Sequence, residues 1–146
     1  RGRMALNVEV KAGPEGLYPG IIDRLIDRVV SNGLEESLVV SSFRREYLLE
    51  LRSKAPGVRA ALLYSKPFAE PWQEAAEQGW DLHPHAGAID AELINEAHSR
   101  GVMVRAWTVN EPEAMRHLIN LGVDAIITNF PDRLRKVLQG KDESEC

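Results

Sequence analysis

A carboxylate and an ammonium stand two residues apart in the first strand-like run of the chain, residues 5–11. Side chains of an extended strand alternate between its faces, so Asn7, Glu9 and Lys11 share one face and the apolar residues share the other. Burying an isolated charge is costly, so Glu9 and Lys11 need partners. Two interpretations stay open: an internal ion pair, or a carboxylate for a hard divalent cation beside a lysine for an anionic oxygen.

Two histidines and a tryptophan follow other strand-like runs. His83 and His85 flank Pro84; they could ligate a metal, but two ligands do not complete a site, and loop histidines at a pocket rim are the alternative. Trp107 suits core packing or a pocket wall. Polar residues at further predicted strand ends also suit turns and caps: Ser41, Ser42, Ser65, Asn110, Thr128 and Asn129.

Strand-like and helix-like segments alternate along the chain, which favours βα units and a parallel sheet. The predicted strands are residues 5–10, 38–42, 59–64, 80–83, 102–109 and 124–128. The predicted helices are residues 19–31, 45–54, 67–77, 90–99, 111–121 and 131–138. Asp90 and Asn110 stand where helix N-caps are expected.

Five glycines follow the predicted helices at near-constant spacing: Gly33, Gly57, Gly79, Gly101 and Gly122, which lie 24, 22, 22 and 21 residues apart. Glycine suits a left-handed residue at a helix end. A βα unit repeated evenly, without a Gly-x-Gly-x-x-Gly turn, favours a (β/α)8 TIM-type barrel over a doubly wound sheet. Six units are counted, whereas a closed barrel needs eight and about 250 residues. We therefore expect an α/β fold of the incomplete-barrel type.

Length, composition and charge limit the remaining options. The 146 residues are 44% hydrophobic and 27% charged, as in an ordinary single globular domain, and the net charge is −4. These values argue against a disordered chain and against a nucleic-acid partner held by a basic patch. No apolar run approaches a membrane span. The single cysteine, Cys146, and the lack of a visible secretory signal lead us to expect a cytoplasmic protein. We expect one domain over residues 1–140 and a frayed acidic tail over residues 141–146.

Five segments, in order, resemble motifs of the glycerophosphodiester phosphodiesterase family. They are the "E-x-K" strand, the "SSF" strand end, the "L-H/N-P" strand, the "WTVN" strand and the final "GVDxIITxxP" segment, at residues 6–11, 39–43, 82–84, 106–110 and 122–131. The resemblance implies a (β/α)8 barrel that hydrolyses glycerophosphodiesters to an alcohol and sn-glycerol 3-phosphate with a divalent cation, Ca²⁺ or Mg²⁺. It also implies roles for four residues: Glu9 as a metal ligand, Lys11 at the phosphate, Trp107 as a pocket wall and His83 at the pocket rim.

The family's "HRG", "E-x-D" and "HD" segments, which supply both catalytic histidines and the other metal carboxylates, have no counterpart in these 146 residues. We therefore expect the chain alone to be inactive. Three hypotheses remain: the C-terminal three-quarters of such an enzyme, from a truncated or processed sequence; a non-catalytic binding or self-associating module, with a homodimer covering the open barrel edges; or an unrelated phosphate-handling barrel. Activity on a phosphorylated sugar would favour the third.

Overall fold

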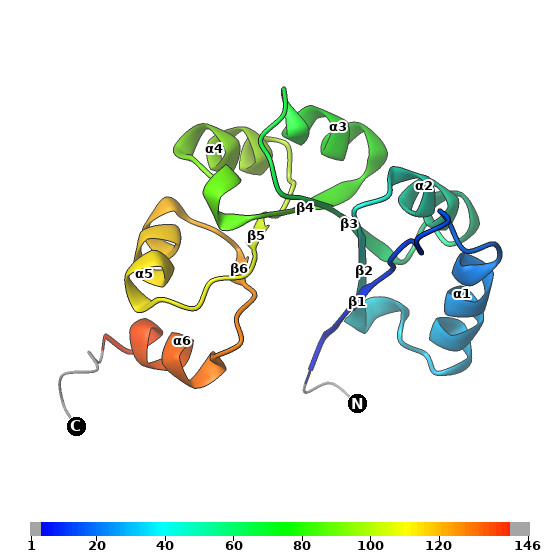
Figure 1. Ribbon diagram of the computed structural model, residues 1–146, viewed down its shortest axis with the longest axis horizontal. Helices are drawn as coiled ribbons and strands as arrows, with labels where there is room; N and C mark the ends of the chain where they lie inside the picture. Colours follow the sequence, from blue (N-terminus) through cyan, green and yellow to red (C-terminus); the bar gives the residue numbers. More distant parts are fainter. Residues whose placement is uncertain (1–3, 141–146) are drawn as a thin grey trace.

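The computed structural model describes residues 4–140, and this part of the chain forms an open arch with strands on its inner side and helices outside (Figure 1). The strands are β1 (Leu6–Glu9), β2 (Leu38–Ser42), β3 (Arg59–Tyr64), β4 (Trp80–Pro84), β5 (Arg105–Ala106) and β6 (Ala125–Ile126). The α-helices are α1 (Ile21–Ser31), α2 (Arg45–Lys54), α3 (Pro71–Gln78), α4 (Ala91–Ser99), α5 (Pro112–Leu121) and α6 (Pro131–Leu138), and the 3-10 helices are η1 (Glu35–Ser37) and η2 (Ala86–Ala88). The predicted alternation is confirmed, while the predicted tail and Cys146 lie outside the described residues.

All paired strands run parallel and follow the order of the sequence. One sheet has the order β1-β2-β3-β4, and β5 pairs with β6. Backbone bonds join the two sheets, because Leu82 N–H donates to Met103 O over 2.9 Å and Trp107 N–H donates to Pro84 O over 3.2 Å. The six strands of this region therefore form one curved wall, as expected for an incomplete (β/α)8 barrel.

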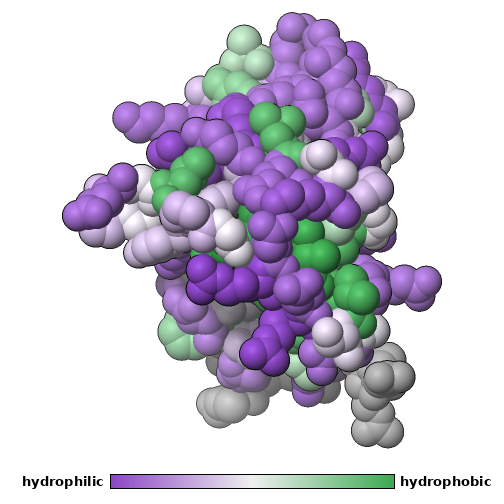
Figure 2. Space-filling view, turned by 90° about the vertical axis from the view of Figure 1, so that its right-hand side faces the viewer, coloured by the Kyte–Doolittle hydropathy of each residue, from purple (hydrophilic) through white to green (hydrophobic). Residues whose placement is uncertain are grey.

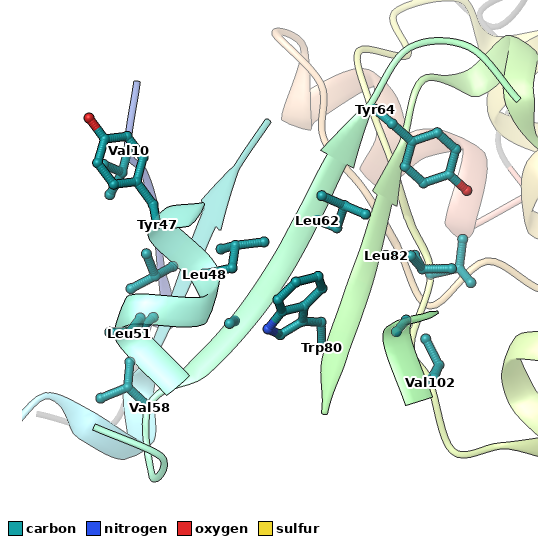
Figure 3. Close-up of a cluster of buried hydrophobic side chains, with 14 of the residues drawn as sticks. Val10, Tyr47, Leu48, Leu51, Val58, Leu62, Tyr64, Trp80, Leu82 and Val102 are labelled. Atoms are coloured by element: carbon teal, nitrogen blue, oxygen red, sulfur yellow. The ribbon is translucent and has the colours of Figure 1, made fainter. Parts of the chain in front are cut away.

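Apolar side chains fill the layer between the wall and the helices. Leu62 and Leu82 from β3 and β4 are fully buried and share a cluster with Leu48 and Leu51 of α2 (Figure 3). Each such side chain contributes about 1.5–3 kcal/mol through burial. The outer face over α1 and α2 is mostly hydrophilic, with hydrophobic groups scattered across it (Figure 2). None of the helices in residues 4–140 has the length and apolar character of a membrane span.

Helices α3 and α5 are among those that begin later than predicted. Helix α3 begins at Pro71 rather than at residue 67, because a residue before proline is disfavoured in the helical region. Helix α5 begins at Pro112 with Glu111 as its N-cap. The expected cap Asn110 instead accepts, through Oδ1, the Thr128 hydroxyl and the Asn129 amide over 3.2 and 3.0 Å. Partners distant in the sequence thus occupy the side-chain oxygen that was expected to cap α5.

The other local predictions are confirmed in part. The Asp90 cap of α4 is confirmed, since its Oδ1 accepts the Leu93 amide over 2.8 Å. Four of the five expected glycines have a positive φ, but Gly57 does not. Strands β5 and β6 are shorter than predicted. One reason is that the Asp124 carboxylate accepts the Val104 amide over 2.7 Å, so a side chain occupies a position in the backbone ladder.

Candidate active site

A hollow of about 340 Å³ lies on the concave side of the arch. Its lining comes from β1, β2 and β3 and from the segments that follow β5 and β6: Asn7, Glu9, Lys11, Ser41, Phe43, Leu63, Trp107, Thr108 and Ile127. In parallel α/β barrels, ligands bind at the carboxyl ends of the strands, where this hollow lies. The hollow is therefore the candidate site.

The three polar residues of the first strand-like run line this hollow together, as predicted from their alternation. Lys11 Nζ lies 3.9 Å from Glu9 Oε2, and the two side chains are 75% and 33% exposed. The two groups thus lie within ion-pair distance but not as an internal pair, and an exposed pair at this distance contributes only about 0–1 kcal/mol. Both groups therefore remain able to bind a ligand at little cost.

Ser42 fixes the end of β1 that carries these groups. Its hydroxyl donates to Val10 O over 2.6 Å and accepts the Arg44 amide over 3.1 Å. The Val10 amide in turn donates to Ser41 O over 2.8 Å. The neighbouring Ser41 hydroxyl is equally buried but has no hydrogen-bond partner among the described residues. Of the two serines in the "SSF" segment, only Ser42 therefore anchors the end of β1 through its hydroxyl.

Trp107 forms a wall of the hollow, in the position expected for it. Its indole N–H donates to His83 O over 2.7 Å. The ring meets Phe43 and His85 edge-on, with centroids 5.6 and 5.2 Å apart. These contacts, from β4 and from the ends of β2 and β4, hold the indole in one orientation. What the indole binds stays a prediction.

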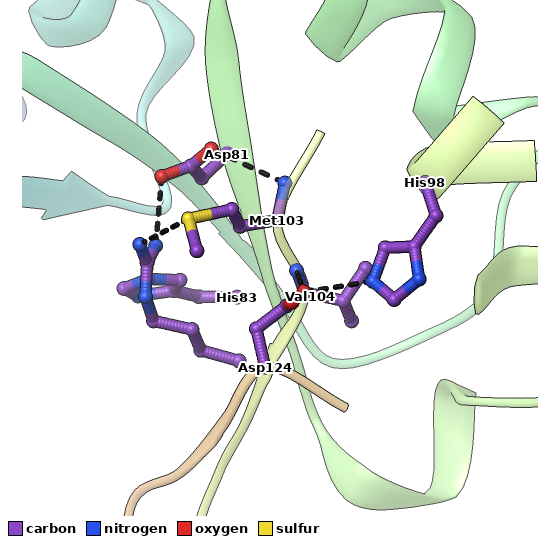
Figure 4. Close-up of polar contacts among 7 residues, drawn as sticks. Asp81, His83, His98, Met103, Val104 and Asp124 are labelled. Atoms are coloured by element: carbon purple, nitrogen blue, oxygen red, sulfur yellow. Dashed lines mark hydrogen bonds and ion pairs between the residues drawn. The ribbon is translucent and has the colours of Figure 1, made fainter. Parts of the chain in front are cut away.

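His83 does not lie at the pocket rim, so the expected position is wrong. Its side chain is 1% exposed, and its Nε2 lies 3.1 Å from a nitrogen of Arg105, which is paired with Asp81 over 2.8 Å. Figure 4 shows this polar cluster beside β4. Burial, followed by the Arg105 charge, lowers the pKa of His83 to about 3. The neutral ring accepts from Arg105 at Nε2 and carries its proton on Nδ1.

His85 takes the exposed position instead. Its Nδ1 accepts the Gly87 amide over 3.1 Å, which places the ring proton on Nε2. The edge contact with Trp107 brings this ring beside the wall of the hollow. Strand β4 ends at Pro84, one residue later than predicted, and His85 follows it directly. The periodicity of the strand could not separate the two histidines, because residues two apart share a face.

A divalent cation would not find a full ligand set in this part of the chain. Residues 4–140 contain no group of three or more His, Cys, Asp or Glu side chains that could hold a metal ion. Glu9 offers one carboxylate and Asn7 one amide oxygen, whereas Ca²⁺ or Mg²⁺ takes about six oxygens. These residues therefore do not fit a complete cation site.

Comparisons with known proteins agree with this fold. The model of the glycerophosphoryl diester phosphodiesterase family matches residues 6–133. The glycerophosphodiester phosphodiesterase of Caldanaerobacter subterraneus subsp. tengcongensis is 37% identical over 130 residues, covering 88% of this chain and 53% of that protein.

Solved structures show the same arch within larger chains. A Silicibacter pomeroyi protein whose name places it in this family superposes with a TM-score of 0.86 at 29% identity, covering 94% of this chain and 52% of that one. An Oleispira antarctica phosphodiesterase, solved with the product sn-glycerol-3-phosphate, superposes with a TM-score of 0.82 at 23% identity, covering 93% and 56%.

The chain thus spans just over half of these relatives, less than the three-quarters that six of eight equal units would make. The family model covers most of the chain, the strands form the expected wall, and Glu9, Lys11 and Trp107 line one hollow. The chain belongs to the glycerophosphoryl diester phosphodiesterase family.

Proposed function

We propose that the concave face of this chain serves the hydrolysis of glycerophosphodiesters to an alcohol and sn-glycerol 3-phosphate. The observation that carries the proposal is the pairing of Glu9 with Lys11 in a hollow walled by Trp107, in a member of this family. The product held by the Oleispira antarctica neighbour supports this substrate class.

Each residue has a distinct role in this proposal. Lys11 binds a phosphoryl oxygen and offsets the negative charge that develops there. Trp107 and His85 border the space for the glycerol or alcohol portion. His83 has an indirect role, because its backbone carbonyl orients the indole of Trp107. Glu9 would supply one ligand of a divalent cation, which would polarise the phosphodiester when bound.

The incomplete ligand set leads us to propose that the 146 residues alone do not turn over substrate. The alternative is a non-catalytic binding or self-associating module. The open ends of the wall favour it, since β1 and β6 each pair with one strand in residues 4–140. A cytoplasmic location also stays a proposal, which cell fractionation would test.

A hydrolysis assay on glycerophosphocholine with Ca²⁺ or Mg²⁺ tests the proposal, run beside sedimentation analysis. We expect a folded monomer or dimer without turnover. Turnover that is lost in Glu9→Gln but kept in the control Glu113→Gln, exposed on α5, would show that these 146 residues contain a working site and make His85 the candidate proton donor. Turnover unchanged in Glu9→Gln would remove Glu9 from the site.

A further inference from the structure

A second hollow lies on the helix side of the wall, between the loop that follows β3 and the beginning of α4. Its volume is about 220 Å³, and it shares no lining residue with the concave hollow. The lining consists of Tyr64, Pro67, Phe68, Ala69, Glu70, Pro71, Trp72, Ala88, Asp90, Glu92 and Leu93. The volume suits a small ligand, because pockets for drug-sized molecules begin at about 300 Å³.

Aromatic rings and carboxylates make up the functional groups of this lining, and no Lys, Arg or His is among them. Phe68 packs edge-on against Tyr64, with centroids 5.0 Å apart and planes at 77°. Arg45 lies 5.2 Å from the Phe68 ring centre, but its charge is paired with Glu74 over 2.8 Å. The hollow is therefore aromatic and negatively charged.

The Tyr64 hydroxyl is a second, independent feature of this lining. The residue is 8% exposed, and its hydroxyl is buried with no hydrogen-bond partner among the described residues. Figure 3 shows the ring extending from the end of β3, away from α2. Burial, followed by the charge of Asp90, raises the pKa of Tyr64, so the hydroxyl keeps its proton and stays neutral. An unpaired buried polar group in a native structure calls for an explanation.

The backbone beside the hollow is also unusual. Glu70 has a φ of 49°, and no other non-glycine residue in residues 4–140 has a positive φ. Such conformations are uncommon for residues with a Cβ and often occur at ligand-binding segments. The following Pro71 begins α3 and fixes the direction of the chain there. Glu70 is one of the residues that line the hollow.

We propose that this hollow binds a small organic ammonium ion that also carries a hydroxyl, with its quaternary ammonium group held against Tyr64, Phe68 and Trp72 and its hydroxyl as the partner of the Tyr64 hydroxyl. Cations are attracted to the faces of aromatic rings, and aromatic cages are a known form of site for quaternary ammonium. The carboxylates of Glu70, Asp90 and Glu92 complement the charge. Asp90 uses one oxygen to cap α4. The proposal does not depend on the proposed hydrolysis, because the two hollows are separate.

Calorimetric titration of the whole chain with choline chloride tests the site, with 3,3-dimethylbutan-1-ol as the neutral isostere. We expect saturable 1:1 binding of choline that is at least about tenfold tighter than binding of the isostere, as one good cation–π contact would give. Equal affinity for the two probes, or no saturation by choline, would overturn the proposal.

Matched variants locate the binding. Glu92→Gln, at an exposed position, should weaken choline binding several-fold, and Trp72→Leu should weaken it further. Glu77→Gln, exposed on the same helix as Trp72 but outside the lining, should leave it unchanged. Binding that is unaffected by both Glu92→Gln and Trp72→Leu would place choline elsewhere and refute the site.

Discussion

Replacing Ser42 by alanine should destabilise the chain, whereas the same change at Ser41 should not. Both side chains are fully buried on β2, but only the Ser42 hydroxyl is bonded, to Val10 O over 2.6 Å and from the Arg44 amide over 3.1 Å. A net hydrogen bond contributes about 0.5–1.5 kcal/mol, so two lost bonds give about 1–3 kcal/mol. Ser41 lacks a partner among the described residues, and its removal should change stability by less than about 0.5 kcal/mol or raise it.

Thermal unfolding followed by far-ultraviolet circular dichroism measures the difference. At about 2–4 °C per kcal/mol for a chain of this size, Ser42→Ala should lower Tm by roughly 4–8 °C for a central loss of about 2 kcal/mol. Ser41→Ala is the matched control, since the residue type, strand and burial are the same. Equal shifts in the two variants would contradict the assignment of the β1 anchor to Ser42.

Three further changes test other parts of the structure. Arg105→Met removes the cation paired with the Asp81 carboxylate, which is 12% exposed, and should lower the free energy of unfolding in urea by about 3–5 kcal/mol. Adding Asp81→Leu should restore stability, and no recovery would contradict the pairing. Folding lowers the pKa of His83 from 6.5 to about 3, so stability should fall as pH drops below 6.5, by about 1.4 kcal/mol per pH unit until about pH 3. His83→Asn should flatten this profile, and an unchanged profile would assign the loss to other groups. Gly122→Ala should lower Tm, because Gly122 has a φ of 94°. Gly57 has open space around it and no positive φ, so Gly57→Ala should leave Tm unchanged or raise it. The reverse order of the two Tm values would refute the glycine assignments.

Local periodicity was sufficient to predict the wall and the face that carries the first polar pair. Strand alternation depends only on neighbouring residues, so Glu9 and Lys11 could be placed on one face before any tertiary contact was known. The βα alternation in the same way gave the incomplete barrel. The family motifs then indicated which hollow to expect, although the roles of the residues in it remain proposals.

How deeply a side chain is buried, and which of several hydrogen-bond partners it takes, could not be predicted from the sequence. His83 is buried, and Arg105, distant in sequence, lies against its ring. Strand alternation gives the face on which a residue lies but not how deeply it is buried. Asn110 was expected to cap α5, but partners 18 and 19 residues away occupy its side-chain oxygen. Both differences arise from contacts between separate βα units, which one sequence without an alignment does not reveal.

The most direct test of the central claim is titration of the chain with sn-glycerol 3-phosphate, monitored by the indole N–H resonances in NMR. The concave site predicts a saturable shift of the Trp107 indole signal. The affinity obtained from this shift should fall at least about tenfold in Lys11→Met, because the phosphate loses its cation. The control Lys66→Met, exposed and outside the hollow, should bind as the parent chain does. Binding that is unchanged in Lys11→Met, or a Trp107 signal that does not move, would contradict the assignment of this face to the glycerophosphodiester site.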